Sequence, residues 1–446
     1  MLTILRTSLA VLLSAYFASG SLMACGSSSD APTMSAGAGG YGSSGSAGVA
    51  GHAQAMAGSS SATGGNSGAG GAVSGGSANG SAGNGSSSGS AGRNGSAGSA
   101  GSTGSAAGAG ASAGAGNGAG STGFAPWPGG NQVVTVDPVN TYASDLSGLH
   151  YEPAQGAAEA VLWAVQNQPS KLYRLLWNGS AWVSDTNNGW GSGKALHFPD
   201  GQGAPDSEGV TKGVLGSSGL YVSCERDNQV SATSRLSVLL FDGAASGATL
   251  TATREWNLTA VLPKVGANLG LEAIAWVPDS YLVDKGFIDE SKQLAYDPAS
   301  YGDHGDGVFF VGVEQDGMIH GFVLDHTSGA FTRVASFESG HSGVMDLSFD
   351  RDVGYLWAVC DDTCQGRTNV LDIDTHAGSL THGRFYVRRG FERPSTMANL
   401  NNEGFTLTSE STCQSGFKSV FYAEDGSTMG FAIRRDSIPC GPFLGN

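Results

Sequence analysis

A short unit recurs along the chain, in which one small or acidic residue opens a run of apolar residues. Its clearest copy spans Leu271 to Trp276, where Glu272 precedes alternating small and large apolar side chains. The five copies begin at Ser147, Glu208, Glu272, Met345 and Glu403. Short apolar runs of this length, bounded by Gly and polar residues, predict β-strands rather than helices.

Further apolar runs follow each opening run. The second runs cover 161–166, 220–225, 309–314, 356–361 and 420–424, and the third cover 172–177, 236–241, 320–324, 370–373 and 430–433. Four of the five copies then continue into a turn and a fourth run; the turns are Asn178-Gly179, Asp242-Gly243, 325–329 and 374–378. Asn, Asp and Gly suit the positive φ angles of hairpin turns, so each repeat predicts a small antiparallel sheet of four strands.

Five such sheets predict an all-β chain folded as a five-bladed β-propeller. The repeats start near 147, 207, 271, 345 and 402, at intervals of about 57 to 74 residues, which a blade with loop insertions can fill. The insert 279–306 accounts for the longest repeat. The last repeat ends after its third strand, and the isolated run 132–136 can supply the fourth, which removes a free edge. A six-bladed ring is the alternative if 124–146 holds more structure.

The segment before this domain differs sharply in composition. From Cys25 to Gly123 the chain is almost wholly Gly, Ser, Ala, Asn and Thr, and it has little apolar surface to offset the entropy of ordering. We therefore expect three parts: a signal peptide at 1–24, a disordered low-complexity tether at 25–123 and the propeller at 124–446.

The first residues resemble a bacterial lipoprotein signal. Arg6 precedes an apolar run from Leu9 to Phe17, which is too short for a spanning helix, and small residues then lead to Cys25. The resemblance implies cleavage before Cys25 and lipid modification of its thiol. It places the protein in the bacterial cell envelope as a membrane-anchored lipoprotein, with the outer membrane or cell surface favoured. An ordinary secretory signal cut nearby is the alternative.

Charge narrows the set of partners. The whole chain has 22 basic and 38 acidic residues, and only Arg6, Arg93 and Asp30 fall in 1–124, so the domain carries a net charge of −17. This excess argues against nonspecific binding to nucleic acid or to an anionic membrane surface. It fits a cation-binding surface or simple solubility, and we expect a monomer.

Five cysteines lie in the domain, and an exported protein can keep disulfides. Cys360 and Cys364 flank a tight turn. Cys413 and Cys440 lie in loops that project from the same end of the last blade. These four are the expected disulfide cysteines, whereas Cys224 is left over and is expected to be a buried, inert thiol.

Acidic residues occupy matching positions in the repeats. The start of strand one and the end of strand two lie at the same end of a blade, near the axis, because the two strands are antiparallel. Seven carboxylates are thus predicted at one mouth of the central channel: Glu208, Glu225, Glu272, Glu314, Asp361, Glu403 and Glu424. A hard cation with oxygen ligands, Ca²⁺ above all, would relieve their repulsion. The alternative is that each acid only accepts hydrogen bonds from strand N–H groups.

Four basic or imidazole side chains are expected on loops of the same end: Arg226, Arg367, Arg393 and His341. Around a bound cation they could hold a phosphate or a carboxylate of a small or polymeric ligand, or they could pair with nearby acids. His150 takes a first-strand position near the axis, where a core role is the alternative to a channel-facing one. The domain has no Gly-x-Ser-x-Gly elbow, zinc spacing or phosphate-binding loop, which argues against the usual serine-hydrolase, zinc-hydrolase and nucleotide-binding classes.

The repeated strand starts resemble the bacterial phytase-like, esterase-like propeller family over about 147–438. The resemblance is carried by 206–210, 221–226, 271–275 and 402–405, with recurring Glu-Gly-aliphatic openings. It implies phosphoester or ester hydrolysis. The corresponding hypothesis is a calcium-dependent hydrolase with Glu272 or Glu208 as catalytic base. The alternatives are a non-catalytic envelope module that binds protein or glycan, and a sensor or accessory subunit.

Overall fold

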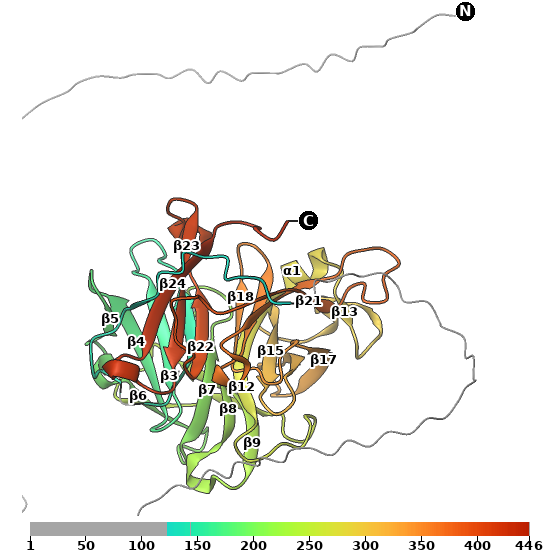
Figure 1. The fold of residues 1–446 in the computed structure, drawn as a ribbon. Coiled ribbons are helices and arrows are strands. Elements are labelled where there is room, and N and C mark those ends of the chain that lie inside the picture. The colour runs from blue at the N-terminus through green and yellow to red at the C-terminus, as the bar shows by residue number, and fades with distance from the viewer. Residues whose placement is uncertain (1–122, 143, 446) are drawn as a thin grey trace, which may run out of the picture. The chain divides into compact units, whose positions relative to one another are not determined.

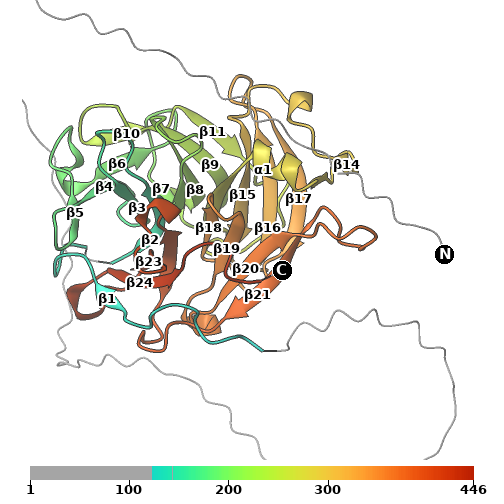
Figure 2. The ribbon, with the colours of Figure 1, turned by 90° about the horizontal axis from the view of Figure 1, so that it is seen from above.

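The computed structural model describes residues 123–142 and 144–445. The expected signal peptide, the lipid-modified Cys25 and the tether up to residue 122 lie outside the described residues. Within the described part, the chain folds as a five-bladed β-propeller of small antiparallel sheets, as the repeats predicted (Figure 1). Figure 2, seen from above, shows the sheets following one another around the ring in chain order.

The blades are numbered here in chain order of their innermost strands. Blade one has β2 (Leu146–Glu152), β3 (Val161–Gln166), β4 (Lys171–Trp177), β5 (Trp182–Ser184) and β6 (Lys194–His197). Blade two has β7 (Pro205–Thr211), β8 (Gly219–Asp227), β9 (Ser234–Asp242) and β11 (Arg254–Asn257). Blade three has β12 (Leu271–Pro278), β15 (Gly307–Val313), β16 (Met318–Leu324) and β17 (Phe331–Glu338). Blade four has β18 (Asp346–Asp350), β19 (Tyr355–Val359), β20 (Thr368–Ile373) and β21 (Phe385–Phe391). Blade five has β22 (Asn402–Leu407), β23 (Phe417–Glu424), β24 (Ile433–Pro439) and β1 (Val134–Thr135).

The remaining elements lie in connections. The insert of blade three holds α1 (Asp279–Asp284), the hairpin β13 (Ile288–Asp289) and β14 (Leu294–Ala295), and the 3₁₀ turn η3 (Pro298–Ser300). Other 3₁₀ turns are η1 (Trp190–Ser192), η2 (Asn228–Val230), η4 (Asp362–Cys364), η5 (Glu410–Thr412) and η6 (Thr428–Gly430). Blade one departs from the predicted four strands, because β10 (Thr249–Thr251), from the connection between β9 and β11, pairs in parallel with β6.

The first strand of each repeat is the innermost strand of its sheet, and these five strands contact one another in a ring. Small residues make this approach feasible. A Cβ added to Gly148 would lie 2.5 Å from the carbonyl oxygen of Glu208, and one added to Gly209 would lie 2.9 Å from that of Glu272. At these two positions, close packing around the axis therefore requires a residue without a side chain.

The ring closes through the two ends of the domain. In blade five, β1 pairs with β24 in antiparallel register, with Val134 opposite Arg435. Asp137 strengthens the join, since its carboxylate accepts the N–H groups of Ala432 and Ile433 at 2.9 and 3.1 Å. The predicted closure is confirmed. The third strand of this blade begins only at Ile433, not at 430 as predicted, because positive φ angles at Met429 and Gly430 end extended structure there.

The hydrophobic core lies between neighbouring blades. Phe310 of blade three packs against Phe385 of blade four with ring centroids 5.2 Å apart, and Trp357 of blade four packs against Phe405 of blade five at 5.8 Å. Each blade thus buries apolar side chains on both faces, as the nearly continuous apolar runs of the second strands predict. This packing fixes the inner strands whose starts carry the acids.

Candidate cation-binding site at one mouth of the axis

The opening Glu of three repeats lies at an irregularity of the inner strand. The pairing of β12 with β15 shifts register between Leu271 and Ala273, and that of β22 with β23 shifts between Asn402 and Gly404. Glu272 and Glu403 are thus the extra residues of β-bulges, and Glu208 lies within a similar shift in β7. A bulge re-aims a side chain that regular alternation would place elsewhere. Of the two blades without this Glu, blade four pairs β18 with β19 regularly, whereas blade one shifts register between Leu146 and Leu149.

Two overlapping groups of acids form at this mouth. Carboxylate oxygens of Glu225, Glu272 and Glu314 all lie within 4.8 Å of one another, and so do those of Asp206, Glu208 and Glu225. Glu225 belongs to both groups. The predicted convergence of strand-one starts and strand-two ends is therefore found for these residues, whereas their role as ligands or bases stays a prediction.

The group of Glu225, Glu272 and Glu314 has few positive partners. Glu225 accepts the N–H of Gly270 at 2.6 Å and lies 3.4 Å from the guanidinium of Arg226. Glu272 is 6% exposed, and no hydrogen-bond donor among the described residues reaches its carboxylate. Glu314 is less buried and likewise accepts no side-chain hydrogen bond in residues 123–142 and 144–445. A buried carboxylate without a donor is costly unless it is protonated or bound to a cation.

The pKa values of the mouth follow from this crowding. Burial, and then the neighbouring acids, raise the pKa of Glu272 and of Glu208 well above the usual 4.5. Burial raises the pKa of Glu225 and of Glu314 to about 7, and that of Glu403 to about 8. The protein without a cation therefore holds protons at this mouth near neutral pH, and a divalent cation would compete with them.

The second group, Asp206, Glu208 and Glu225, has more partners that offset its negative charge. Asp206 forms an ion pair with Arg226 at 2.7 Å, and the amide of Asn167 lies 3.4 Å from a carboxylate oxygen of Glu208. Asp206 was not among the predicted site residues. Its spacing of two from Glu208 on one strand was the signal that could have placed both side chains on the same face.

The other three predicted acids have partners of their own. Glu403 accepts from Ser147 at 3.1 Å and from Asn401 at 2.9 Å. Asp361 caps the turn η4, accepting from Thr363 N at 3.0 Å. Glu424 accepts from Thr428 and forms an ion pair with Arg434 at 2.6 Å, so both of its oxygens are occupied. Glu424 is the predicted acid that is least available to a cation.

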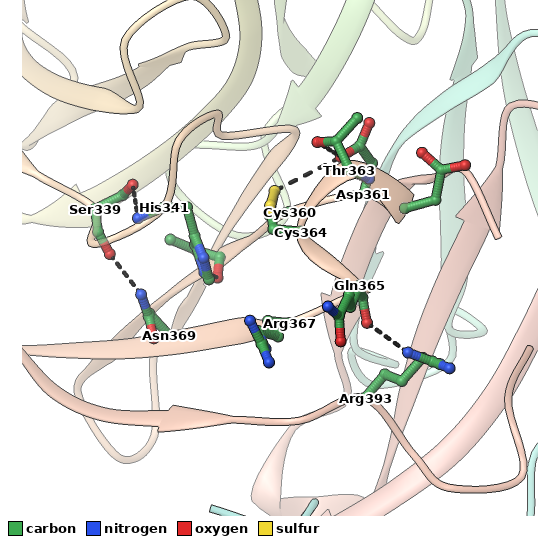
Figure 3. The surroundings of a disulfide bond; sticks show 12 residues. Ser339, His341, Cys360, Asp361, Thr363, Cys364, Gln365, Arg367, Asn369 and Arg393 are labelled. Carbon is green, nitrogen blue, oxygen red and sulfur yellow. Dashed lines mark hydrogen bonds between the residues drawn. A yellow bond between two sulfur atoms is a disulfide. The ribbon is translucent and has the colours of Figure 1, made fainter. Parts of the chain in front are cut away.

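The predicted anion-binding side chains are engaged within the protein. Arg226 also donates to the carbonyl of Ala267 at 2.6 Å. Arg367 forms a bidentate pair with Glu392, with both N–O distances at 3.1 Å. Arg393 donates to the carbonyls of Met397 and Gln365. Figure 3 shows Arg367 and Arg393 near the turn from Asp361 to Gln365.

His341 is half-buried beside the same turn. Its ring stacks on Phe124 with centroids 6.2 Å apart, and Nε2 lies 3.3 Å from the carbonyl oxygen of Ala358. Burial lowers the pKa of His341 to about 4, so the ring is neutral at physiological pH. A neutral, stacked imidazole is a poor anion ligand, so a substrate-binding role for His341 has little support in its surroundings.

His150 lies at the opposite end of the axis. It lines a cavity of about 90 Å³ together with Thr211, Trp276, Ser348 and Thr406. Its Nε2 is buried without a hydrogen-bond partner among the described residues, and burial lowers the pKa of the ring well below 6.5. His150 thus belongs to neither group of acids.

The cysteines lie as expected. Cys360 and Cys364 form a disulfide with Cα atoms 5.9 Å apart, and Cys413 and Cys440 form one with Cα atoms 6.1 Å apart. Cys224 is buried and unpaired with any other described cysteine, and burial raises the pKa of its thiol. A thiol held in this way is unreactive.

No family model matches the chain. No curated protein matches it either. Among solved structures, it is similar to a chain of a nidogen/laminin complex, with 13% identity and a TM-score of 0.30 over 63% of this chain and 73% of that one. It is also similar to a chain of a mitotic checkpoint complex, with 11% identity and a TM-score of 0.31 over 70% and 93% of the two chains. Likeness at this level assigns no activity.

The part of the chain that the structure describes contains no helix with the length and apolar character needed to cross a membrane.

Proposed function

We propose that the mouth formed by Glu225, Glu272 and Glu314 binds a divalent cation, Ca²⁺ in the first instance. The observation that carries this proposal is Glu272, which is 6% exposed. Its carboxylate accepts no hydrogen bond from the described residues and lies within 4.8 Å of two other carboxylates. All the atoms that would bind the metal are carboxylate oxygens, which fit a hard cation and not a soft one.

The surrounding residues suit such a role. The N–H of Gly270 and the guanidinium of Arg226 orient Glu225, so its carboxylate is held before any ion arrives. The bulge in β12 turns Glu272 towards Glu225 and Glu314. Glu314 is the least buried of the three and provides the side open to solvent. Preorganised carboxylates of this kind avoid part of the entropy cost of assembling a site.

For activity, we propose hydrolysis of phosphoesters or esters, as the family resemblance of the strand openings implies. A cation bound here would supply Lewis-acid polarisation of a phosphoryl oxygen. Glu208 is the candidate base on the chain itself, because it lies outside the group of Glu225, Glu272 and Glu314 while its carboxylate lies within 4.8 Å of that of Glu225. Burial raises the pKa of Glu208 well above 4.5, so its ionised form would accept a proton more readily than an ordinary carboxylate. Glu272 remains the second candidate for this role.

A non-catalytic calcium-binding module of the cell envelope is the second candidate function. It is favoured by the state of the basic side chains, since Arg226, Arg367 and Arg393 all donate to groups of the protein itself. A hydrolase of phosphoesters normally presents free cationic groups to the leaving phosphate. A binding module needs only the cation and its solvent-facing side to capture an acidic protein or glycan.

The proposed location of the protein is a membrane of the cell envelope. A lipid on Cys25 would attach the chain to the membrane ahead of the low-complexity segment 25–123. Replacement of Cys25 by Ser should release the protein from the membrane fraction. Retention of the C25S variant in that fraction would reject lipid anchoring.

One experiment separates the two functions. The purified full chain is melted with Ca²⁺ and with a chelator, and the same samples are assayed on phosphoesters and carboxylesters. A Ca²⁺-dependent rise in Tm with Ca²⁺-dependent turnover supports the hydrolase. A rise in Tm without turnover supports the binding module. An unchanged Tm with no turnover would reject the cation site and the enzyme together.

A further inference from the structure

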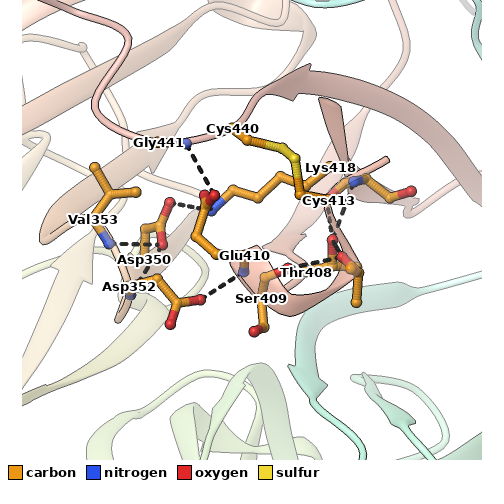
Figure 4. A network of polar contacts seen from close by, with 12 residues as sticks. Asp350, Asp352, Val353, Thr408, Ser409, Glu410, Cys413, Lys418, Cys440 and Gly441 are labelled. Carbon is orange, nitrogen blue, oxygen red and sulfur yellow. Dashed lines mark hydrogen bonds and ion pairs between the residues drawn. A yellow bond between two sulfur atoms is a disulfide. The ribbon is translucent and has the colours of Figure 1, made fainter. Parts of the chain in front are cut away.

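Lys418 of β23 is completely buried, with a side-chain exposure of 0%, and its ammonium contacts two carboxylates. Nζ lies 2.6 Å from Oδ2 of Asp350 and 2.8 Å from Oε1 of Glu410. Figure 4 shows the three side chains converging beside the Cys413–Cys440 disulfide. Asp350 belongs to blade four, whereas Lys418 and Glu410 belong to blade five.

Backbone groups hold the two acids in different ways. Oδ1 of Asp350 accepts the N–H groups of Asp352 and Val353, each at 3.3 Å, so this oxygen faces two donors while Oδ2 faces the lysine. The other acid, Glu410, is fixed through Oε2 by the N–H of Gly441 at 3.0 Å. Its Oε1 accepts no hydrogen bond among the described residues apart from its contact with Lys418.

The charges of Lys418, Asp350 and Glu410 do not balance one another. One buried cation faces two carboxylates, and burial raises the pKa of Asp350 despite the nearby lysine. In a low-dielectric site, transfer of a proton from the ammonium to Asp350 removes two buried charges at once. The products, a neutral amine and a carboxylic acid in contact, are the reactants of amide formation.

We propose that Lys418 and Asp350 condense into an intramolecular isopeptide bond, with Glu410 as the proton carrier. Nζ of the neutral amine attacks Cγ of protonated Asp350, and the developing oxyanion on Oδ1 is stabilised by the N–H groups of Asp352 and Val353. Glu410 takes a proton from the attacking nitrogen and gives it to the departing hydroxyl, so the C–O bond breaks as the C–N bond is completed. One ammonium and one carboxylate become one amide and one water, and no oxidant or co-reactant is needed.

The position of this bond would make the ring of blades harder to open. It would join the end of β18 to the start of β23, across the boundary between blades four and five, over a separation of 68 residues. The disulfide Cys413–Cys440 joins only two loops within blade five. A cross-link between blades resists opening of the ring in a way that links within one blade do not.

A second buried lysine provides a matched comparison. Lys212 of blade two lies 2.7 Å from Glu152 of blade one, again across a blade boundary, with side-chain exposures of 5% and 13%. No second carboxylate pairs with Lys212 among the described ion pairs, so this pair lacks a proton carrier. We expect Lys212 to remain a free amine.

The test is a peptide map of the full chain, denatured, reduced and alkylated before digestion with trypsin. A bond at Lys418 prevents cleavage after this residue and joins peptide 334–351 to peptide 390–434, with a total mass about 18 Da below their sum. Digestion should still proceed after Lys212. Recovery of separate peptides 334–351, 390–418 and 419–434 with no joined species would overturn the proposal.

Two variants sharpen the result. Lys418→Arg keeps the charge but should give no joined peptide, and a species of the joined mass in this variant would assign the cross-link to another residue and overturn the proposal. Glu410→Gln keeps the size of the side chain and should lower the joined fraction at least tenfold. Complete joining in E410Q would overturn the role assigned to Glu410. The map of the unaltered protein decides the main question even where a variant fails to fold.

Discussion

The backbone N–H of Phe405 in β22 donates a hydrogen bond of 2.6 Å to Oδ2 of Asp346 in β18. The same oxygen lies 3.4 Å from the N–H of Leu149 in β2, and Oδ1 accepts the N–H of Leu347. Asp346 is fully buried and takes the place of the small residue that follows the opening position in the other repeats. A single carboxylate thus connects the inner strands of three blades near the axis.

Replacement of Asp346 by Ala should therefore destabilise the ring strongly. It leaves buried N–H groups of Phe405 and Leu149 without an acceptor, and we expect a loss of about 3 kcal/mol in the free energy of unfolding. Urea denaturation at pH 7 measures this loss. The control is D284A, on an exposed residue of α1, which should change stability by less than about 0.5 kcal/mol. Equal stability of both variants would show that Asp346 is not a structural link.

Replacement of Glu272 by Gln tests the cation site directly. It replaces a buried acid, whose pKa burial and crowding raise well above 4.5, by a neutral side chain, so the chelator-treated variant should melt above the unaltered protein. The affinity for Ca²⁺ should fall at least tenfold, which corresponds to about 1.4 kcal/mol. Isothermal titration gives the affinity, and E338Q, on an exposed acid of β17, is the matched control. Unchanged affinity in E272Q would remove Glu272 from the site.

Without a cation, the protein should become less stable as the pH rises from about 5 to 8. Burial raises the pKa of Glu225 and Glu314 to about 7 and that of Glu403 to about 8, above the 4.5 of the unfolded chain. Between these values the folded state binds more protons than the unfolded state, so stability falls with rising pH. Melting in chelator at several pH values measures the trend. Saturating Ca²⁺ should reduce it, and an unaltered slope would contradict binding at these acids.

The buried His320 should have the opposite effect on stability, making the protein less stable as the pH falls. Burial lowers the pKa of this ring to about 4, and both ring nitrogens lack a partner among the described residues. The unfolded state therefore binds a proton between pH 6.5 and 4 that the folded state does not, so stability falls as the pH drops through this window. Replacement of His320 by Leu removes this contribution, which opposes that of the acids, so stability in chelator should fall more steeply from pH 4.5 to 7 in the variant, as measured by urea denaturation. A dependence as steep as before would assign it to other groups.

The two disulfides should differ in their contribution to stability. Cys413 and Cys440 are separated by 27 residues and Cys360 and Cys364 by 4, so chain entropy predicts about 3.6 kcal/mol for the first and about 2 kcal/mol for the second. Denaturation of the C413A/C440A and C360A/C364A variants compares them. The prediction fails if the shorter loop contributes more.

The architecture was accessible from the sequence because each inner strand carries its own local signal. Glu272 before a run of small apolar residues indicated both the strand and its place at the axis. The bulges that aim Glu272 and Glu403 were not predicted, since they depend on the register of a partner strand. The parallel pairing of β10 with β6 was missed for the same reason, because 54 residues separate Thr249 from its partner Ala195.

The interaction partners of the side chains at the site were harder to predict from the sequence. Residue type and strand position brought together Glu208, Glu225, Glu272 and Glu314. They could not show that Glu424 pairs with Arg434 or that Arg367 pairs with Glu392. Such pairings depend on side-chain contacts between separate strands. Lys418 carried no signal at all, since a lysine within a strand is usually exposed.

Pairing of β1 with β24 also constrains the order in which the chain can fold. Val134 lies 301 residues before its partner Arg435, so the strand that is synthesised first must wait for the strand synthesised last. Until β1 pairs with it, β24 has an open edge, which can recruit a strand from another molecule. Assembly of the last blade thus requires a chain that extends through β24, and a chain that is cut short before β24 leaves its first strand without a partner.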